Sequence, residues 1–282
     1  MWYYIHFAIF VWIRAITLFH LRLYSKFIFY PYFNRVKLGE GGLVVFNIFY
    51  SLYAHKELKI VVFETLISFF VMCLLYGLND YVDRNHDISN PKKDVAFSKL
   101  IIQHENGFFI ANTLFTILTI FLVSLFLDPL KSIAIILVFA INYTYSKRLK
   151  SFPIADILAV SFWGSMFVML SGKFSLYLIC IAGIMTGISH LFQMLTDKSS
   201  DDANNIKTTV VALPGSETLL LTILFVILGA SLYTKIGCWS LSIAIPFAFY
   251  FISRNVVLSW YIVRVFFFIC WLGLLTLYYG SF

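Results

Sequence analysis

Apolar stretches of about the length of a membrane-spanning helix follow one another along most of the chain. They lie near residues 38–54, 59–79, 106–127, 130–146, 153–172, 175–196, 217–234, 239–254 and 256–280. A helix needs about 20 mostly apolar residues to cross a bilayer. The pattern therefore predicts an all-α fold, a polytopic membrane bundle of about nine transmembrane helices. Residues 1–36 are expected to add an interfacial helix or a further span, and the sequence leaves that choice open. Because there is no internal repeat and no low-complexity linker, we expect a single domain over residues 1–282.

Composition agrees with the membrane interpretation and excludes several other classes. Hydrophobic residues make up 61% of the chain and charged residues 12%, whereas soluble domains carry about 25% charged residues. The four cysteines, Cys73, Cys180, Cys238 and Cys270, are scattered and show no spacing suited to zinc. The net charge of +7 comes from basic residues that form no compact patch, so we expect no nucleic-acid partner.

The distribution of Lys and Arg predicts how the bundle is oriented. With one helix for each apolar stretch, one side collects most of the basic residues: Arg14, Arg22, Lys26, Arg35, Lys37, Arg84, Lys92, Lys93, Lys99, Lys147, Arg148, Lys150, Lys198, Lys207 and Arg254. The other side collects Lys56, Lys59, Lys131, Lys173 and Lys235. Loops rich in Lys and Arg stay in the cytoplasm. We therefore expect a multi-pass protein of a bacterial or archaeal cell membrane, with the first side cytoplasmic.

Two aspartate-rich segments lie on that same side. In the first, Asp80, Asp83 and Asp87 are spaced i, i+3 and i+7, and Asn79 precedes Asp83 by four residues. If the helix continues through them, all four project from one face. Carboxylates this close repel one another unless a cation is shared between them, and Mg²⁺ is commonly held by one or two carboxylates together with substrate phosphates.

The second segment follows the sixth apolar stretch and repeats the arrangement. Asp197 and Asp201 form an i, i+4 pair, and Asp202 is a further candidate ligand. A single acidic cluster is as often a solvated helix end as a binding site. Two clusters, which hold six of the 14 acidic residues, favour a shared task. The sequence thus predicts two aspartate-rich cytoplasmic loops that bind Mg²⁺ and a diphosphate.

Three short motifs in these segments resemble those of the UbiA superfamily of intramembrane prenyltransferases. NDYVDRNHD at 79–87 resembles the NDxxDxxxD motif, and DKSSD at 197–201 resembles DxxxD. YTYSK at 143–147 resembles a third motif, YxxxK, on the same side of the predicted bundle. The resemblance covers nearly the whole chain, in the number, order and spacing of the motifs.

The resemblance implies a mechanism and a set of site residues. Two Mg²⁺ ions would bridge the diphosphate of an isoprenoid donor to Asn79, Asp80, Asp83, Asp87, Asp197 and Asp201. Lys147 would contact the diphosphate, with Tyr143 positioning it, and Arg84 and Lys207 are further candidates for the same contact. Asp80, Asp83, Asp197, Lys147 and Tyr143 would thus be the catalytic residues. An allylic carbocation would form in a pocket shielded from water and react with a small acceptor, which is chemistry suited to a site among membrane lipids.

The chain departs from the family pattern in two places. Many members carry a Gly and then a Thr after the second motif. This chain keeps the Thr, as Thr208, but has Asn205 at the position of the Gly. Asn also adopts the left-handed conformation that ends a helix. After the first motif the chain reads NPKKDVAFSK at 90–99 instead of an Arg-containing run. That continuation is somewhat closer to the branch that transfers phosphoribose to polyprenyl phosphate, which leaves the acceptor open.

Four functions are therefore compared. The leading hypothesis is transfer of a prenyl group to an aromatic or quinone-precursor acceptor. Phosphoribosyl transfer and membrane terpene cyclisation use the same metal motif. A transporter would place its acids near the middle of the membrane on interrupted helices, whereas here they lie at span ends on one side. This placement favours an enzyme.

Overall fold

The computed structural model describes residues 22–36, 41–55, 57–88 and 94–280, and this part of the chain contains helices but no strand. A helical segment over residues 22–36 comes first. The α-helices that follow are α2 (Gly42–Ala54), α3 (Leu58–Asp87), α4 (Val95–Gln103), α5 (Glu105–Phe126), α6 (Pro129–Lys147), α7 (Ala155–Val168), α8 (Leu176–Ala203), α9 (Thr209–Ala212), α10 (Glu217–Ile236), α11 (Ala244–Ser253) and α12 (Val256–Tyr279). Two 3₁₀ segments, η1 (Leu149–Ser151) and η2 (Gly237–Ile243), connect α6 to α7 and α10 to α11. The predicted all-α class is confirmed.

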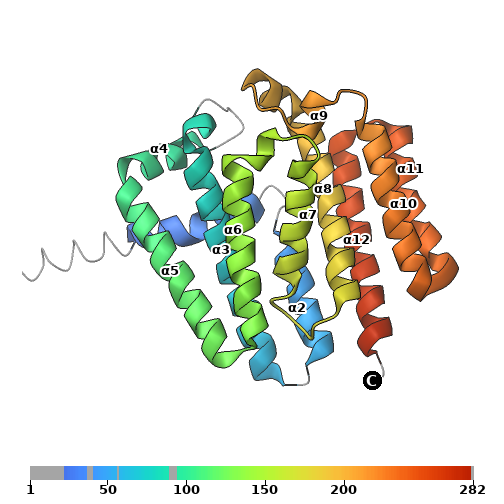
Figure 1. Cartoon of the computed structure of the whole chain (residues 1–282), viewed down its shortest axis with the longest axis horizontal. Helices are drawn as coiled ribbons and strands as arrows, with labels where there is room; N and C mark the ends of the chain where they lie inside the picture. Colours follow the sequence, from blue (N-terminus) through green and yellow to red (C-terminus); the bar gives the residue numbers. More distant parts are fainter. Residues whose placement is uncertain (1–21, 37–40, 56, 89–93, 281–282) are drawn as a thin grey trace, which may run out of the picture.

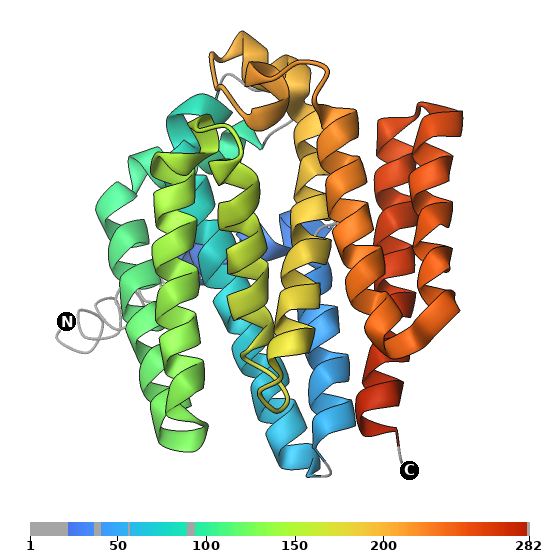
Figure 2. The same ribbon diagram turned by 45° about the vertical axis from the view of Figure 1, so that its right-hand side comes forward.

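Each of the nine predicted apolar stretches falls on a helical segment of the described chain. Six stretches of this part of the chain are long and apolar enough to cross a bilayer by themselves, while α2 and α7 are apolar but shorter. One of the six, Glu217–Ser253, contains α10, η2 and α11, and the chain reverses at η2 so that α10 and α11 run antiparallel (Figure 2). The number of spans therefore stays a prediction. The prediction for residues 1–36 lies partly outside the described residues, and 22–36 run across the bundle axis (Figure 1).

Six helices form a closed ring. Successive contacts join α2 to α3, α3 to α6, α6 to α7, α7 to α8, α8 to α12 and α12 back to α2. Outside this ring, α5 packs on α3 and α6, α10 packs on α8, and α11 packs on α12 (Figure 1). The ring encloses the space in which the candidate site lies.

The two aspartate-rich segments are helical, which corrects the expectation that they are loops. α3 continues through Asp87 and α8 continues through Ala203, so both motifs form the last turns of long helices. Neither motif contains Gly or Pro, and the backbone hydrogen bonds of a helix do not depend on its side chains being apolar. α8 stops where Asn205 takes a left-handed conformation, with φ of 57°. This agrees with the role expected of Asn at that position.

Small residues let α7 and α8 approach closely inside the ring. A Cβ atom added at Gly183 would press on Ser165 and would lie 2.9 Å from the carbonyl oxygen of Ser161. One added at Gly164 or Gly187 would collide with a side chain of the facing helix in the same way. In membranes, where the hydrophobic effect does not drive helices together, such contacts between small residues are a main source of association. They hold the helix that carries the second motif against its neighbour.

A buried polar cluster ties the bundle together at the opposite end from the aspartates. Glu64 of α3 has no exposed surface. Its carboxylate forms an ion pair with Lys131 of α6 and accepts hydrogen bonds from the Ser51 hydroxyl (2.6 Å) and the Gly172 backbone N–H (3.1 Å). A carboxylate buried at membrane depth needs such partners. The Glu64 carboxylate thereby joins α2, α3, α6 and the connection between α7 and α8.

Candidate active site

A cavity of about 910 Å³ lies inside the helix ring. Residues of α2, α3, α6, α7, α8 and α12 line it, together with Arg35 from the helical segment 22–36. Acidic and amide side chains line its walls where α3 and α8 end, and methionine and aromatic side chains line the deeper part. The cavity can thus take a ligand with a charged head and an apolar tail.

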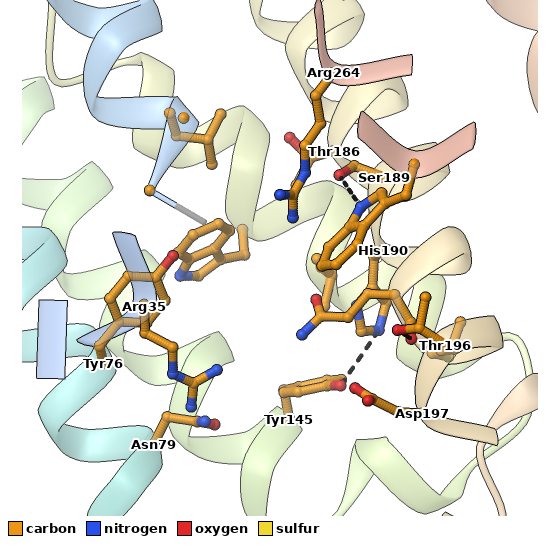
Figure 3. A pocket seen from close by; sticks show the side chains of 18 of the residues that line it. Arg35, Tyr76, Asn79, Tyr145, Thr186, Ser189, His190, Thr196, Asp197 and Arg264 are labelled. Carbon is orange, nitrogen blue, oxygen red and sulfur yellow. Dashed lines mark hydrogen bonds between the residues drawn. The ribbon is translucent and has the colours of Figure 1, made fainter. Parts of the chain in front are cut away.

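Five of the six predicted metal ligands line this one cavity. Asn79, Asp83 and Asp87 come from α3, and Asp197 and Asp201 come from α8. Figure 3 shows Asn79 and Asp197 in the wall of the cavity. Asp83, Asp87 and Asp201 are buried. Two motifs more than one hundred residues apart in the sequence therefore meet at the same end of the bundle, as their predicted location on one side of the membrane requires.

The donor set of this cavity suits Mg²⁺. Carboxylate and amide oxygens are hard ligands, and the Ser146 hydroxyl donates a hydrogen bond to Asn79 Oδ1 (2.7 Å), which fixes the orientation of that amide. Among the described residues, no three His, Cys, Asp or Glu side chains converge into a preassembled metal site. Mg²⁺ keeps several water ligands and is completed by substrate phosphates. The residues therefore fit an ion that binds together with a diphosphate.

Two basic side chains, those of Lys150 and Arg35, lie among these acidic residues. The Lys150 ammonium lies 3.5 Å from Asp83 Oδ2. Arg35 lies 2.9 Å from Asp80 Oδ1, and both side chains are largely buried. Asp80 thus contacts Arg35 and is not among the residues that line the main cavity. Its assignment as a metal ligand stays a prediction.

The helical segment that carries Arg35 is held by a contact outside the spans. The Tyr30 hydroxyl donates a hydrogen bond to Asp94, which also caps α4 by accepting from the Phe97 N–H (3.0 Å). This hydrogen bond, with partial burial, raises the pKa of Tyr30 to about 12. Burial alone raises the pKa of Asp94, but the hydrogen bonds from Tyr30 and the α4 backbone outweigh it and lower that pKa below 3.8. The segment 22–36 is in this way fixed to the end of the bundle.

Tyr143 and Lys147 do not reach the main cavity. Lys147 Nζ donates to the Tyr143 hydroxyl (3.0 Å), and both line an adjoining cavity of about 470 Å³. The two cavities share Asp83, His86, Lys150 and Ile206 as wall residues. A diphosphate held by the aspartates would therefore meet Lys150 before Lys147.

The other two predicted diphosphate contacts also lie outside the main cavity. Arg84 lines the adjoining cavity, forms an ion pair with Glu105 (2.6 Å) and stacks on Tyr81. Lys207 is exposed and lines neither cavity. The roles of Lys147, Tyr143, Arg84 and Lys207 stay predictions.

A buried contact joins the segments that follow α6 and α8. Asp156, at the start of α7, is fully buried and accepts hydrogen bonds from the Thr209 N–H (2.7 Å) and hydroxyl. The Thr209 hydroxyl in turn accepts from the N–H of Ile154 (2.6 Å), which has a φ of 69°. A β-branched residue in that conformation is strained and needs surrounding contacts to hold it. These contacts fix the connection that carries Lys150.

Two hydrogen-bonded aromatic side chains line the wall of the cavity, Tyr145 beside Asp197 and Trp260 further from it (Figure 3). The Tyr145 hydroxyl lies 3.2 Å from His190 Nε2, and the Trp260 indole N–H donates to the Ser189 hydroxyl (3.2 Å) (Figure 3). The guanidinium of Arg264 lies 3.5 Å from the centre of the Trp260 ring. Aromatic faces attract cations, and the Trp260 ring binds the Arg264 guanidinium in this way.

A model of the UbiA prenyltransferase family matches residues 42–269, which is most of the chain. The chain belongs to this family. It is therefore a multi-pass intramembrane prenyltransferase, as the family match and the long apolar stretches of the described residues show.

Solved structures agree with the UbiA assignment in fold. A UbiA homologue from Archaeoglobus fulgidus bound to GPP and Mg²⁺ aligns with a TM-score of 0.64 and 15% identity, over 91% of this chain and 99% of that chain. The same homologue bound to DMAPP and Mg²⁺ aligns equally well. A structure of digeranylgeranylglyceryl phosphate synthase aligns with a TM-score of 0.63 and 17% identity, over 92% of this chain and 98% of that chain. A comparison with the sequences of curated proteins found no significant match.

Several residues of this UbiA cavity were not assigned from the sequence. From the sequence, the positive-inside distribution alone accounts for Lys150 and Arg35, and no motif assigns a role to Arg264. Tyr145 lies within the YxxxK motif, and its spacing of three from Asn142, another lining residue, places both on one helix face. That spacing could have identified Tyr145. Arg264 is also recognisable from the sequence, because an arginine within an apolar span is rare.

Proposed function

We propose that this UbiA-family chain transfers a prenyl group from an isoprenoid diphosphate to an aromatic or quinone-precursor acceptor, with Mg²⁺ as the metal. The observation that carries the proposal is that Asp83 and Asp87 of α3 and Asp197 and Asp201 of α8 line one cavity with an apolar interior. Such a cavity can hold a diphosphate at its acidic end and a prenyl chain among its aromatic side chains. The GPP and DMAPP bound by the A. fulgidus homologue are ligands of this kind.

The chain's own residues account for much of the chemistry. Mg²⁺, when bound, supplies positive charge that stabilises the departing diphosphate. Lys150 lies where it can add a further positive charge beside Asp83. The bond between C1 of the prenyl group and the diphosphate oxygen breaks, and its electron pair leaves with the diphosphate. The allylic cation is then shielded by aromatic walls until an electron pair of the acceptor forms the new bond to C1 and the attacked atom loses its proton to the released diphosphate.

The decisive experiment uses the full-length protein in lipid nanodiscs with Mg²⁺. Labelled dimethylallyl, geranyl, farnesyl and geranylgeranyl diphosphates are each supplied with and without hydroxybenzoate and naphthoate acceptors. We expect a prenylated product that requires both Mg²⁺ and an acceptor. An acceptor-independent hydrocarbon would show a cyclase instead. Inertness toward every prenyl diphosphate, together with turnover of phosphoribosyl diphosphate and a polyprenyl phosphate, would overturn the proposal in favour of phosphoribosyl transfer.

A further inference from the structure

The adjoining cavity is lined mainly by polar and basic side chains. They come from the ends of α3 and α6, which lie at the same end of the bundle (Figure 1), and from η1. Lys147, Arg148 and Lys150 line it together, and Asp83 is the one acidic residue that the described part of the chain places in its wall. Its volume of about 470 Å³ leaves room for a phosphate group with its water, since one water takes about 30 Å³ in the liquid. The cavity is therefore suited to a hydrated anion.

Two of these basic side chains have no acidic partner among the described residues. Lys147 Nζ donates to a hydroxyl, that of Tyr143 (3.0 Å), and forms no ion pair in this part of the chain. Arg148 is exposed, and its guanidinium forms no hydrogen bond or ion pair with the residues that the structure describes. Arg84 lines the same cavity, but its ion pair with Glu105 (2.6 Å) offsets its charge. Because an ammonium carries three donors and a guanidinium five, Lys147 and Arg148 can both bind an anion in their present positions.

The backbone that carries these two residues is fixed on both sides. Before them, the Ser146 hydroxyl donates to Asn79 Oδ1 of α3 (2.7 Å). At Arg148 itself, the N–H donates to the carbonyl of Thr144 (2.9 Å), and the carbonyl accepts from the N–H of Ser151 (3.2 Å). Donors that are already held in position lose little conformational entropy when a ligand binds. The two basic side chains therefore start from a prepared scaffold.

The adjoining cavity meets the main cavity at a shared wall. The residues that line both are Asp83, His86, Lys150 and Ile206. In the main cavity the aspartates attract a diphosphate only through Mg²⁺, because carboxylates and phosphates repel one another at short range. In the adjoining cavity the basic side chains attract the anion directly. A diphosphate that leaves the metal is therefore drawn past Lys150 toward Lys147 and Arg148.

We propose that the adjoining cavity is a second anion site, in which Lys147 and Arg148 bind the inorganic diphosphate released from the donor before it leaves the protein. The site is separate from the one that holds the donor, so donor and inorganic diphosphate can be bound at the same time. This inference rests on the proposed prenyl transfer, which supplies the diphosphate. A lipid phosphate group has the same chemistry, but only the released product starts from the wall that the two cavities share.

Binding is tested on the full-length protein in nanodiscs of phosphatidylcholine, a lipid without net charge. The main cavity is first saturated with Mg²⁺ and geranyl S-thiolodiphosphate, a donor in which sulfur replaces the bridging oxygen so that it reacts far more slowly. Inorganic diphosphate is then added, and its binding is measured by calorimetry. Wild type, Lys147→Gln and Arg148→Gln are compared with Arg254→Gln, which changes an exposed arginine that lines neither cavity.

We expect the saturated wild-type protein to bind inorganic diphosphate. Lys147→Gln and Arg148→Gln should each weaken this binding by about 10-fold, because each loses one charge-assisted hydrogen bond. Arg254→Gln should bind as wild type does. In steady-state assays, inorganic diphosphate should inhibit wild type both by competing with the donor and by binding while the donor is bound. In the double variant, Lys147→Gln with Arg148→Gln, only the competition should remain.

The outcomes separate this inference from the proposed function. No binding to the saturated wild type, or binding that survives in the double variant, overturns the second site while prenyl transfer stands. Loss of the binding in nanodiscs that contain phosphatidylglycerol would show that a lipid phosphate takes the site, which overturns its role in product release. Binding that depends on Arg148, in a protein that transfers no prenyl group to any acceptor, supports the anion site and overturns the proposed function.

Discussion

The ammonium group of Lys150 lies 3.5 Å from the Asp83 carboxylate, at the wall that the main cavity shares with the adjoining one. Lys147, three residues earlier, lines only the adjoining cavity and not the main one. The lysine of the YxxxK motif therefore lies outside the cavity that the predicted metal ligands line, whereas Lys150 lines it. Lys150 is the better placed of the two to contact a diphosphate at Asp83.

The first prediction compares these two lysines. Lys150→Gln should lower kcat/KM for the prenyl diphosphate by about 10- to 100-fold, because one charge-assisted contact to the leaving group is lost. Lys147→Gln should have a smaller effect. Steady-state kinetics with a radiolabelled donor measures both, and Lys173→Gln, an exposed change outside both cavities, is the matched control. A larger loss in Lys147→Gln than in Lys150→Gln would contradict this order.

The second prediction concerns the metal. Asp83→Asn and Asp197→Asn keep the shape of the side chain but remove a negative charge from the cavity. Each should lower activity by at least about 100-fold and raise the Mg²⁺ concentration needed for half-maximal activity. Thermal unfolding should change little, since Asn keeps the shape of the side chain and both side chains face a cavity, not the packed core. Asp128→Asn, at the exposed start of α6, is the control, and full activity in either cavity variant would refute the metal assignment.

Helical periodicity explains why the aspartate cluster could be predicted from the sequence. Residues spaced by three or four share a face wherever the helix continues, so Asp83 and Asp87 could be placed together before the fold was known. The positive-inside distribution then placed the motifs of α3 and α8 at one end of the bundle. Both steps depend only on local spacing and on the count of spans.

The remaining parts of the site depend on packing between helices that are distant in sequence. The ion pair between Arg35 and Asp80 joins two elements whose relative position no local pattern encodes. The same holds for the support of Trp260 by Ser189, because it requires the crossing of α12 with α8. Hydropathy also marks only the apolar part of a helix, so it does not show that α3 and α8 continue through their polar last turns.

The third prediction tests the buried cluster around Glu64. Glu64→Ala leaves Lys131 buried without its carboxylate and should destabilise the protein by about 3–5 kcal/mol. A double variant, Glu64→Gln with Lys131→Met, should recover much of this loss, because no uncompensated charge remains. Thermal unfolding in detergent micelles measures both variants. If Glu64→Ala unfolds at the wild-type temperature, the cluster does not stabilise the bundle.

The fourth prediction tests the close approach of α7 and α8. Gly183→Val adds atoms where even a Cβ meets Ser165 and the backbone of Ser161, so we expect a loss of about 1–3 kcal/mol in the free energy of unfolding. Activity should also fall, since α8 carries Asp197 and would shift. Gly273→Ala is the control, because nothing lies within 4 Å of a Cβ added there, and it should stabilise α12 by up to about 1 kcal/mol. Equal stability of the two variants would show that α7 and α8 have room to separate.

The fifth prediction uses pH to test the contact that fixes the segment of Arg35. Tyr30 has a raised pKa of about 12 because its hydroxyl donates to Asp94. Its contribution to stability is therefore fully present below its ordinary pKa of 10 and is lost as the pH rises from 10 through 12. Tyr30→Phe should lower the free energy of unfolding by about 1 kcal/mol at pH 8, and the difference from wild type should shrink between pH 10 and pH 12. Thermal unfolding at a series of pH values measures this, with Tyr233→Phe on the exposed α10–α11 hairpin as the control. A difference that stays constant across this range would mean that the hydrogen bond to Asp94 does not stabilise the fold.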